Sequence, residues 1–313
     1  MSTPLLVPPP KKASSPTLVA ATPAIAQAVK PDFAQDSMNI FRRFPVEQRA
    51  AMVNFYQNAL DMPALQPIQL STNQQMLLFR AGRTGQIKLA AGITPGKAYN
   101  PGGAIGDYTG IRLFELHYPD EAAVAARFTA AGVDAPVFKT VGGKRIAIVR
   151  DPGGFNIALI ITPGASPATT GGVEVGVHVT DLARSRAFYR DFAGLDELPP
   201  VQDPVLGTTK YPFRHGETTI SLFTTAKKVP ADTGSAGVQY VTRNVRAIND
   251  RAIAEKVKID TPLGGVRGFN VLTVWMSDPD GVTNYFYETG PRPTGAGAPG
   301  GPPAGAGAPP SAQ

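Results

Sequence analysis

The chain has 313 residues, 42% hydrophobic and 17% charged, which is enough apolar material for one large or two medium domains. Cysteine is absent, so disulfides, thiolate metal sites and cysteine nucleophiles are excluded. The net charge of +6 comes from scattered Lys and Arg residues, which argues against nucleic-acid binding and favours small anionic ligands, and no apolar run reaches the ~18 residues of a membrane span.

Both ends of the chain are expected to lie outside the folded core. Residues 1–37 are rich in Pro, Ala, Ser and Thr, and a basic pair precedes an apolar stretch that ends in small residues. This order resembles a secretory signal removed before Val29 and predicts a periplasmic or secreted protein. Pro16 and Pro23 interrupt the stretch, so a disordered tail on a cytoplasmic protein stays open as the alternative. Residues 291–313 are almost entirely Gly, Ala and Pro, which predicts a disordered tail.

Between these ends, the first half predicts alternating strands and a capped helix. Residues 111–118 predict a strand. Asp120 and a helix with Val124 and Phe128 follow, and Gly132 ends this helix as a C-terminal cap. Strands are then expected over 144–150 and 155–162.

The second half repeats this order more clearly. Asp181 can cap a helix whose apolar face contains Phe188 and Phe192, and Asn244 can cap the next helix. Lys210 is expected in a solvated hairpin. The predicted strands lie over 173–180, 196–201, 208–214, 217–224, 237–242, 269–277 and 282–288. The unit strand–helix–strand–strand–strand thus occurs four times in the chain.

Two short motifs recur in the same order in both halves. The Phe-Tyr pair at 55–56 returns at 188–189 after 133 residues, and the Asp-Pro turn at 151–154 returns at 278–281 after 127 residues. Nearly equal offsets indicate a duplication.

A connection rich in Pro, Gly, Ser and Thr separates the two halves. It predicts a linker over 164–172, with one domain over 38–163 and a second over 173–290.

The stretch from Val175 to Tyr189, together with the Asp278-Pro-Asp-Gly turn and the strand after it, resembles the vicinal-oxygen-chelate superfamily of glyoxalases, bleomycin resistance proteins and extradiol dioxygenases. The resemblance covers residues 38–290 and is clearest over 173–290. It implies an α+β fold of two tandem domains, each a pair of βαβββ modules that forms a cupped mixed sheet.

In metal-dependent members of this superfamily, four strands of a cup each offer one His, Glu or Gln to the ion. In the second half these positions fall at Glu174, near Ser221, at Gly237 or Val238, and at Tyr285. In the first half they fall near Phe41, Leu89, Arg112 and Ala158. Only Glu174 is a good ligand for a divalent ion, so no cofactor is expected, and Fe, Zn, Mn or Ni is the alternative.

The resemblance therefore favours one site, in the cup of residues 173–290, with the first domain as a scaffold. Glu174 is the expected base or hydrogen-bond acceptor, and His178 and Tyr285 are the expected donors or acids. The expected contacts to the bound molecule are Ser221, Trp275 and Tyr287.

Three functions stay open at this point. The favoured one is the binding of a small oxygenated organic molecule without a metal, as in antibiotic-sequestering members of the superfamily. The alternative is a metal-dependent lyase, isomerase or extradiol-type dioxygenase that uses Glu174 and His178. A third is a structural protein with unused cups. The expected partner is a small molecule, with neither nucleic acid nor membrane, and the oligomeric state is left open.

Overall fold

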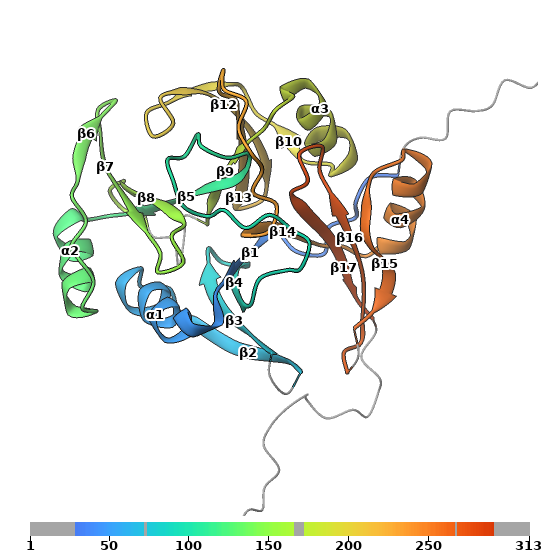
Figure 1. Ribbon diagram of the computed structural model, residues 1–313, viewed down its shortest axis with the longest axis horizontal. Helices are drawn as coiled ribbons and strands as arrows, with labels where there is room; N and C mark the ends of the chain where they lie inside the picture. Colours follow the sequence, from blue (N-terminus) through green and yellow to red (C-terminus); the bar gives the residue numbers. More distant parts are fainter. Residues whose placement is uncertain (1–28, 72–73, 166–171, 267, 291–313) are drawn as a thin grey trace, which may run out of the picture.

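The computed structural model describes residues 29–71, 74–165, 172–266 and 268–290. These residues form four modules, each a strand, a helix and three or four further strands, arranged in two curved sheets (Figure 1). The predicted α+β class and the order of elements are confirmed. No helix in the described ranges is long and apolar enough to cross a membrane.

The first half of the chain contains modules 1 and 2. Module 1 consists of β1 (Asn39–Phe44), η1 (Val46–Gln48), α1 (Arg49–Asn54), the π-helical turn η2 (Phe55–Ala59), β2 (Ala64–Ser71), β3 (Gln74–Ala81) and β4 (Gly85–Ala91). Module 2 consists of β5 (Gly110–Tyr118), α2 (Glu121–Ala130), β6 (Lys139–Val141), β7 (Lys144–Arg150) and β8 (Asn156–Ile161).

The second half contains modules 3 and 4. Module 3 consists of β9 (Glu174–His178), α3 (Leu182–Ala187), the π-helical turn η3 (Phe188–Phe192), β10 (Asp196–Glu197), β11 (Val201–Asp203), β12 (Thr208–His215) and β13 (Thr218–Phe223). Module 4 consists of β14 (Ala236–Val241), α4 (Val245–Ala254), β15 (Ile259–Gly265), β16 (Val271–Ser277) and β17 (Thr283–Thr289).

Of the two N-terminal helix caps predicted, the one at Asp181 is confirmed, and Asp120 also caps its helix. Asp120 and Asp181 each accept a hydrogen bond from a backbone N–H in the first turn of α2 and α3, at 2.6 and 3.1 Å. Asn244 precedes α4 but makes no cap bond, and the prediction of a cap there was wrong. Its side-chain oxygen instead accepts a hydrogen bond from the backbone of Asp32 at 2.9 Å, because a segment distant in the sequence packs beside it.

Each sheet joins one module of the first half to one module of the second. The first sheet has the order β15-β16-β17-β14-β1-β4-β3-β2, and the second has the order β10-β12-β13-β9-β5-β8-β7-β6. β1 pairs antiparallel with β14, and β5 pairs antiparallel with β9. Modules 1 and 4 therefore form the first cup, and modules 2 and 3 form the second. This differs from the expected pairing of modules within each half.

The two modules of each half still contact each other through the repeated motifs. The hydroxyl of Tyr56 donates to Asp151 at 3.2 Å, and that of Tyr189 donates to Asp278 at 2.9 Å. Each Tyr follows the helix of one module, and each Asp opens the turn before the last strand of the next module. The duplicated residues thus connect helix and turn, while the sheets are shared between the halves.

Two buried ion pairs connect one sheet to the other. Arg42 on β1 donates to Asp151, between β7 and β8, at 3.0 Å. Arg112 on β5 donates to Asp232, shortly before β14, at 3.0 Å. All four side chains are 0% exposed, so removal of one partner would leave a buried unpaired charge at a cost of about 3–5 kcal/mol.

Part of the segment that composition placed outside the core is packed against the second half. The backbone N–H of Ala34 donates to Val241 at 2.8 Å, and the ring of Phe33 stacks on His215 with 3.8 Å between ring centres. The predicted signal within residues 1–28 and the predicted tail over 291–313 lie outside the described residues.

The pairing of β1 with β14 can be tested by engineered disulfides, because the chain has no cysteine. Asn39 and Gln239 are direct partners across these strands, and their side chains are hydrogen-bonded at 2.8 Å. We expect Asn39→Cys/Gln239→Cys to form an intramolecular disulfide under mild oxidation, detected as a crosslinked peptide by mass spectrometry. The control is Asn39→Cys/His117→Cys, which places the second thiol on β5. Crosslinking of the control alone would show that modules pair within one half.

Candidate functional site

The structure divides the predicted site residues between the two cups. Glu174 and His178 lie on β9 and Ser221 lies on β13, all in the second sheet. The three aromatic residues lie on β16 and β17 of the first sheet; they are Trp275, Tyr285 and Tyr287. The single site expected over 173–290 is therefore not assembled, because β9 and β14 belong to different sheets.

The first cup contains a cavity of about 290 Å³ between its two modules. Its size is at the lower end of the range for small-molecule sites. Strands β2, β3 and β4 supply one side, and β14, β16 and β17 supply the other. The lining residues are Arg43, Ile68, Leu70, Met76, Lys88, Ala90, Gln239, Val266, Phe269, Val271, Thr273, Trp275, Tyr285 and Tyr287.

An aromatic ladder forms one wall of this cavity. Trp275 and Tyr285 are direct partners across β16 and β17, and their rings stack with 4.4 Å between centres and 8° between planes. The ring of Phe41 on β1 packs against both, at 6.0 and 5.7 Å. Burial raises the pKa of Tyr285, so this phenol stays neutral and can donate a hydrogen bond. The wall is suited to a flat apolar group.

The buried amine of Lys88 faces the same cavity. Lys88 is 7% exposed, and its Nζ donates to Oε1 of Gln239 at 2.5 Å. The amide of Asn39 donates to the same oxygen at 2.8 Å, which fixes the orientation of Gln239. Burial lowers the pKa of Lys88 to about 8, because the charged form is separated from water. Sequence reasoning missed Lys88, although its place beside Leu89 on a central strand was a usable signal.

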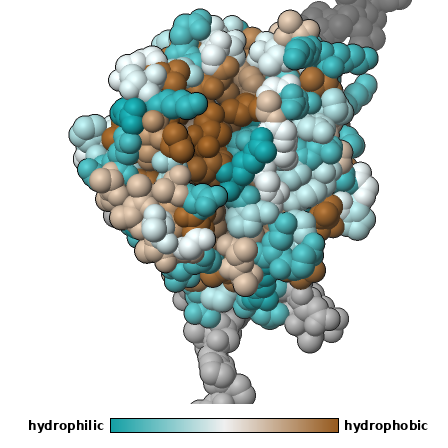
Figure 2. Space-filling view, turned by 60° about the vertical axis from the view of Figure 1, so that its left-hand side comes forward, coloured by the Kyte–Doolittle hydropathy of each residue, from teal (hydrophilic) through white to brown (hydrophobic). Residues whose placement is uncertain are grey.

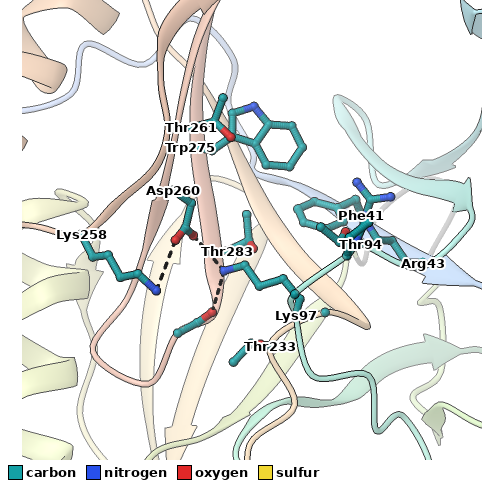
Figure 3. A pocket seen from close by; sticks show the side chains of 14 residues that line it. Phe41, Arg43, Thr94, Lys97, Thr233, Lys258, Asp260, Thr261, Trp275 and Thr283 are labelled. Carbon is teal, nitrogen blue, oxygen red and sulfur yellow. Dashed lines mark hydrogen bonds and ion pairs between the residues drawn. The ribbon is translucent and has the colours of Figure 1, made fainter.

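A second cavity of about 350 Å³ adjoins the first and shares Arg43 and Trp275 with it. In Figure 3, Lys97 extends towards Asp260 and away from Arg43, which lies beside Phe41. The ammonium of Lys97 donates to Asp260 at 2.8 Å and to Ser277 at 3.2 Å. Lys258 also pairs with Asp260, at 3.4 Å, so both lysines of this second cavity have a carboxylate partner.

The second cup is occupied by a buried cluster of charges around Lys210. Its ammonium lies 2.5 Å from Asp203, 2.6 Å from Glu174 and 3.2 Å from Glu115. The hydroxyl of Ser221 donates to Glu174 at 2.5 Å. Burial alone would lower the pKa of Lys210, but the three carboxylates together raise it above its usual value. The expectation of a solvated Lys210 was wrong, since its side chain is 10% exposed.

Glu115 is the least satisfied member of the cluster. It lies opposite Glu174 across β5 and β9, and one of its carboxyl oxygens is buried without a hydrogen-bond partner in the described part of the chain. Burial, followed by the charge of Glu174, raises the pKa of Glu115 to about 8 against the pull of Lys210. Sequence reasoning missed Glu115 because its partners come from another module.

His178 is held by neighbours on both ring nitrogens. Its Nδ1 lies 2.8 Å from the backbone oxygen of Tyr108, and its Nε2 lies 3.1 Å from the hydroxyl of Thr225. The ring also stacks on Phe223, with 5.0 Å between centres. Burial lowers the pKa of His178, so a neutral ring is favoured. These contacts are those of a structural histidine.

The residues at the superfamily's metal positions do not fit a divalent ion in either cup. In the first cup, the ring of Phe41 covers Gly237, where an added Cβ would lie 2.2 Å from the ring. In the second cup, Lys210 already neutralises Glu174, and Arg112 is committed to Asp232. The three carboxylates of that cup are gathered around the Lys210 ammonium, and no group of three His, Asp or Glu side chains in the described residues is arranged to hold a metal ion.

The side of the molecule that carries β6, β7 and β8 exposes apolar surface. Figure 2 shows a broad apolar area there, bordered by hydrophilic side chains. The exposed large apolar residues of the β6–β7 region are Val137, Val141 and Ile148. The first cup, in contrast, keeps its aromatic residues inside a cavity.

A comparison with protein families confirms the resemblance. Residues 40–159 match the family described as the Glyoxalase/Bleomycin resistance protein/Dioxygenase superfamily. The match covers the first half, although the motifs quoted from the sequence are clearer in the second. No curated protein matches the sequence.

Solved structures share the fold over most of the chain. Glyoxalase I from Zea mays has a TM-score of 0.61 at 20% identity, with 82% of this chain and 92% of that chain covered. A variant of the same protein has a TM-score of 0.64 at 20% identity and the same coverage. A putative dioxygenase from Bacillus subtilis has a TM-score of 0.56 at 14% identity, with 84% and 87% covered. At these identities the likeness shows the fold.

The raised pKa of Glu115 predicts how stability depends on pH. Between pH 4.5 and about 8, the folded chain keeps a proton on Glu115 that the unfolded chain has released, so Glu115 makes stability fall as the pH rises through this window. We therefore expect the free energy of unfolding of Glu115→Gln, relative to that of the unsubstituted protein, to increase between pH 5 and pH 8.5. The increase should be ~1.4 kcal/mol for each unit by which the pKa of Glu115 differs between the folded and unfolded protein. Urea unfolding at both pH values measures this.

The control for this measurement is Glu121→Gln, which removes an exposed carboxylate that pairs with Arg145 at 2.8 Å. Its effect on the unfolding free energy should be small at both pH values. An equal effect of Glu115→Gln at pH 5 and pH 8.5 would show that Glu115 is ionised in the folded protein throughout.

Proposed function

Starting from the match of residues 40–159 to the glyoxalase, bleomycin resistance and dioxygenase superfamily, we propose that the protein binds a small oxygenated organic molecule in its first cup without a divalent metal. The observation that carries the proposal is the closed aromatic wall of Trp275 and Tyr285 beside a cavity of about 290 Å³. Apolar walls bind the body of a ligand, and a few polar groups fix its orientation. Here Lys88 and Gln239 are those polar groups.

This proposal keeps three of the residues chosen from the sequence and changes their partners. Trp275, Tyr285 and Tyr287 line the cavity, but the opposite wall comes from module 1. The first half therefore contributes directly to the site and is more than a scaffold. The binding pocket lies between the halves, at the β1–β14 junction.

The alternative of a metal-dependent enzyme that uses Glu174 and His178 has less support. Glu174 is engaged by Lys210 and Ser221, and both ring nitrogens of His178 have partners. A metal ligand must offer a free lone pair, so His178 would first have to give up one of its ring contacts. Glu174 is held through Oε1 by the Lys210 ammonium, whose positive charge disfavours a cation at the same carboxylate. The donor set of the second cup thus favours a structural role.

Ligand binding can be followed through Trp275, because it is the only Trp in the chain. We expect a screen of small oxygenated aromatic compounds to give saturable quenching of its fluorescence. Tyr287→Ala should weaken the affinity about 10-fold, equivalent to ~1.4 kcal/mol, because it removes part of the cavity wall. The control is Tyr211→Ala on β12, in the other sheet. Binding that responds to Tyr211→Ala and is indifferent to Tyr287→Ala would place the ligand in the second cup.

The metal-free part of the proposal is measured separately. Protein purified without chelator should contain far less than one Fe, Zn, Mn or Ni per chain, and the quenching titration should be unchanged after dialysis against EDTA. A stoichiometric ion whose removal abolishes binding would refute metal-free binding. The Tyr287→Ala and Tyr211→Ala variants would still report in which cup the ligand binds.

A further inference from the structure

The two cations of the first cup lack an anionic partner. Lys88 and Arg43 both line the cavity of about 290 Å³, and no Asp or Glu is among the described residues of its lining. In a cavity with low-dielectric walls, such an unbalanced charge attracts anions strongly. The positive charges of the cavity lining therefore favour a negatively charged ligand.

Lys88 is buried without a countercharge. Among the described residues, its ammonium has the neutral oxygen of Gln239 as its hydrogen-bond partner, at 2.5 Å, and forms no ion pair. Lysine is rarely this buried unless it is paired, because the desolvated charge is costly. An anion in the cavity would supply the missing charge and raise the pKa of Lys88 from about 8 towards its usual value.

Arg43 also lacks a carboxylate partner among the described residues, whereas the neighbouring Arg42 has one. The guanidinium of Arg42 pairs with Asp151 and donates to the backbone oxygens of Gly153 and Ser235. The guanidinium of Arg43 points to the other face of β1, where it lies over the ring of Phe41, 6.0 Å from the ring centroid, and forms no ion pair within the described residues. Arg43 stands where the two cavities meet, with its forked donors available to a ligand.

A neutral donor in the lining of the same cavity is also unused. The hydroxyl of Thr273 on β16 lines the cavity and is buried without a hydrogen-bond partner in the described part of the chain. Buried hydroxyls are normally satisfied, so an oxygen-rich ligand group is the natural partner. In the adjoining cavity, by contrast, Lys97 and Lys258 both pair with Asp260, at 2.8 and 3.4 Å.

We propose that the ligand of the first cup is a small organic acid: its anionic group is held by Lys88 and Arg43, and its flat apolar part lies against Trp275 and Tyr285. This inference rests on the proposed function and narrows it to one substrate class. A carboxylate and a phosphonate share the required chemistry, since each offers several oxygens to an ammonium and a guanidinium. A cationic ligand is disfavoured by the same charges.

The test compares an acid with its neutral isostere at one site. Phenylacetate, benzylphosphonate and phenylacetamide are titrated against Trp275 fluorescence at pH 7. We expect at least one of the two acids to bind about 10-fold or more tightly than the amide, because hydrogen bonds to charged groups exceed neutral ones. Whichever acid binds more tightly identifies the anionic group. Equal affinity of acids and amide would overturn this inference and leave the proposed function standing.

Variants then assign the charge to its residues. Lys88→Met and Arg43→Gln should each weaken acid binding about 10-fold and leave amide binding within about 2-fold. Lys88→Met keeps the length of the side chain and removes an unpaired buried charge, so it should fold at least as stably as the unsubstituted protein. Lys139→Met, an exposed lysine on β6, is the control and should change neither affinity.

The pH dependence provides an independent readout. Acid binding should weaken as the pH rises above about 8, where free Lys88 loses its proton, and this decline should be absent in Lys88→Met. Loss of acid and amide binding together in both variants would indicate a collapsed cavity and contradict a charge-specific role. If neither the acids nor the amide gave saturable quenching, the inference would fail. If the wider screen of oxygenated aromatic compounds also found no ligand, the proposed function would be refuted as well.

Discussion

The antiparallel contacts of β1 with β14 and of β5 with β9 decide which side chains share a cup. They bring Asn39 beside Gln239 in the first sheet and Glu115 beside Glu174 in the second. Both junctions join residues that are distant in the sequence. If the modules of each half had paired with one another, the aromatic ladder of β16 and β17 would face β9 and the carboxylate of Glu174, and Lys88 would belong to another cup.

Each cup contains a buried lysine, and the two lysines differ in whether the protein supplies a countercharge. The second encloses a cation, Lys210, with three carboxylates of its own chain, so this cation is paired internally. The first encloses Lys88 with only a neutral amide. Burial without a countercharge costs stability, and a protein keeps such a group most readily where a ligand supplies the charge. This difference supports the proposal that the first cup binds a ligand, whereas the charge cluster of the second cup stabilises the fold.

Local patterns predicted the elements well, because caps, turns and alternation are encoded by neighbouring residues. The helices after Asp120 and Asp181 and most strands of modules 2 to 4 illustrate this, whereas β6 and β15 were not predicted. Trp275 and Tyr285, both chosen as site residues, are direct partners across one hairpin, because cross-strand order within a hairpin is also local. Lys88, Arg43 and Glu115 were not found, since their roles depend on strand pairing between modules and on burial. A repeated motif reveals a duplication, but it does not say which copies share a sheet.

The central claim is that the pocket between modules 1 and 4 holds an acidic ligand. A crystal structure of the protein with a tightly bound aromatic acid tests it most directly. The account predicts density beside the Trp275 ring, with the acid oxygens within hydrogen-bond distance of Lys88 Nζ and the Arg43 guanidinium. Density beside Glu174 and Lys210 in the second cup, with the first cup unchanged, would contradict it.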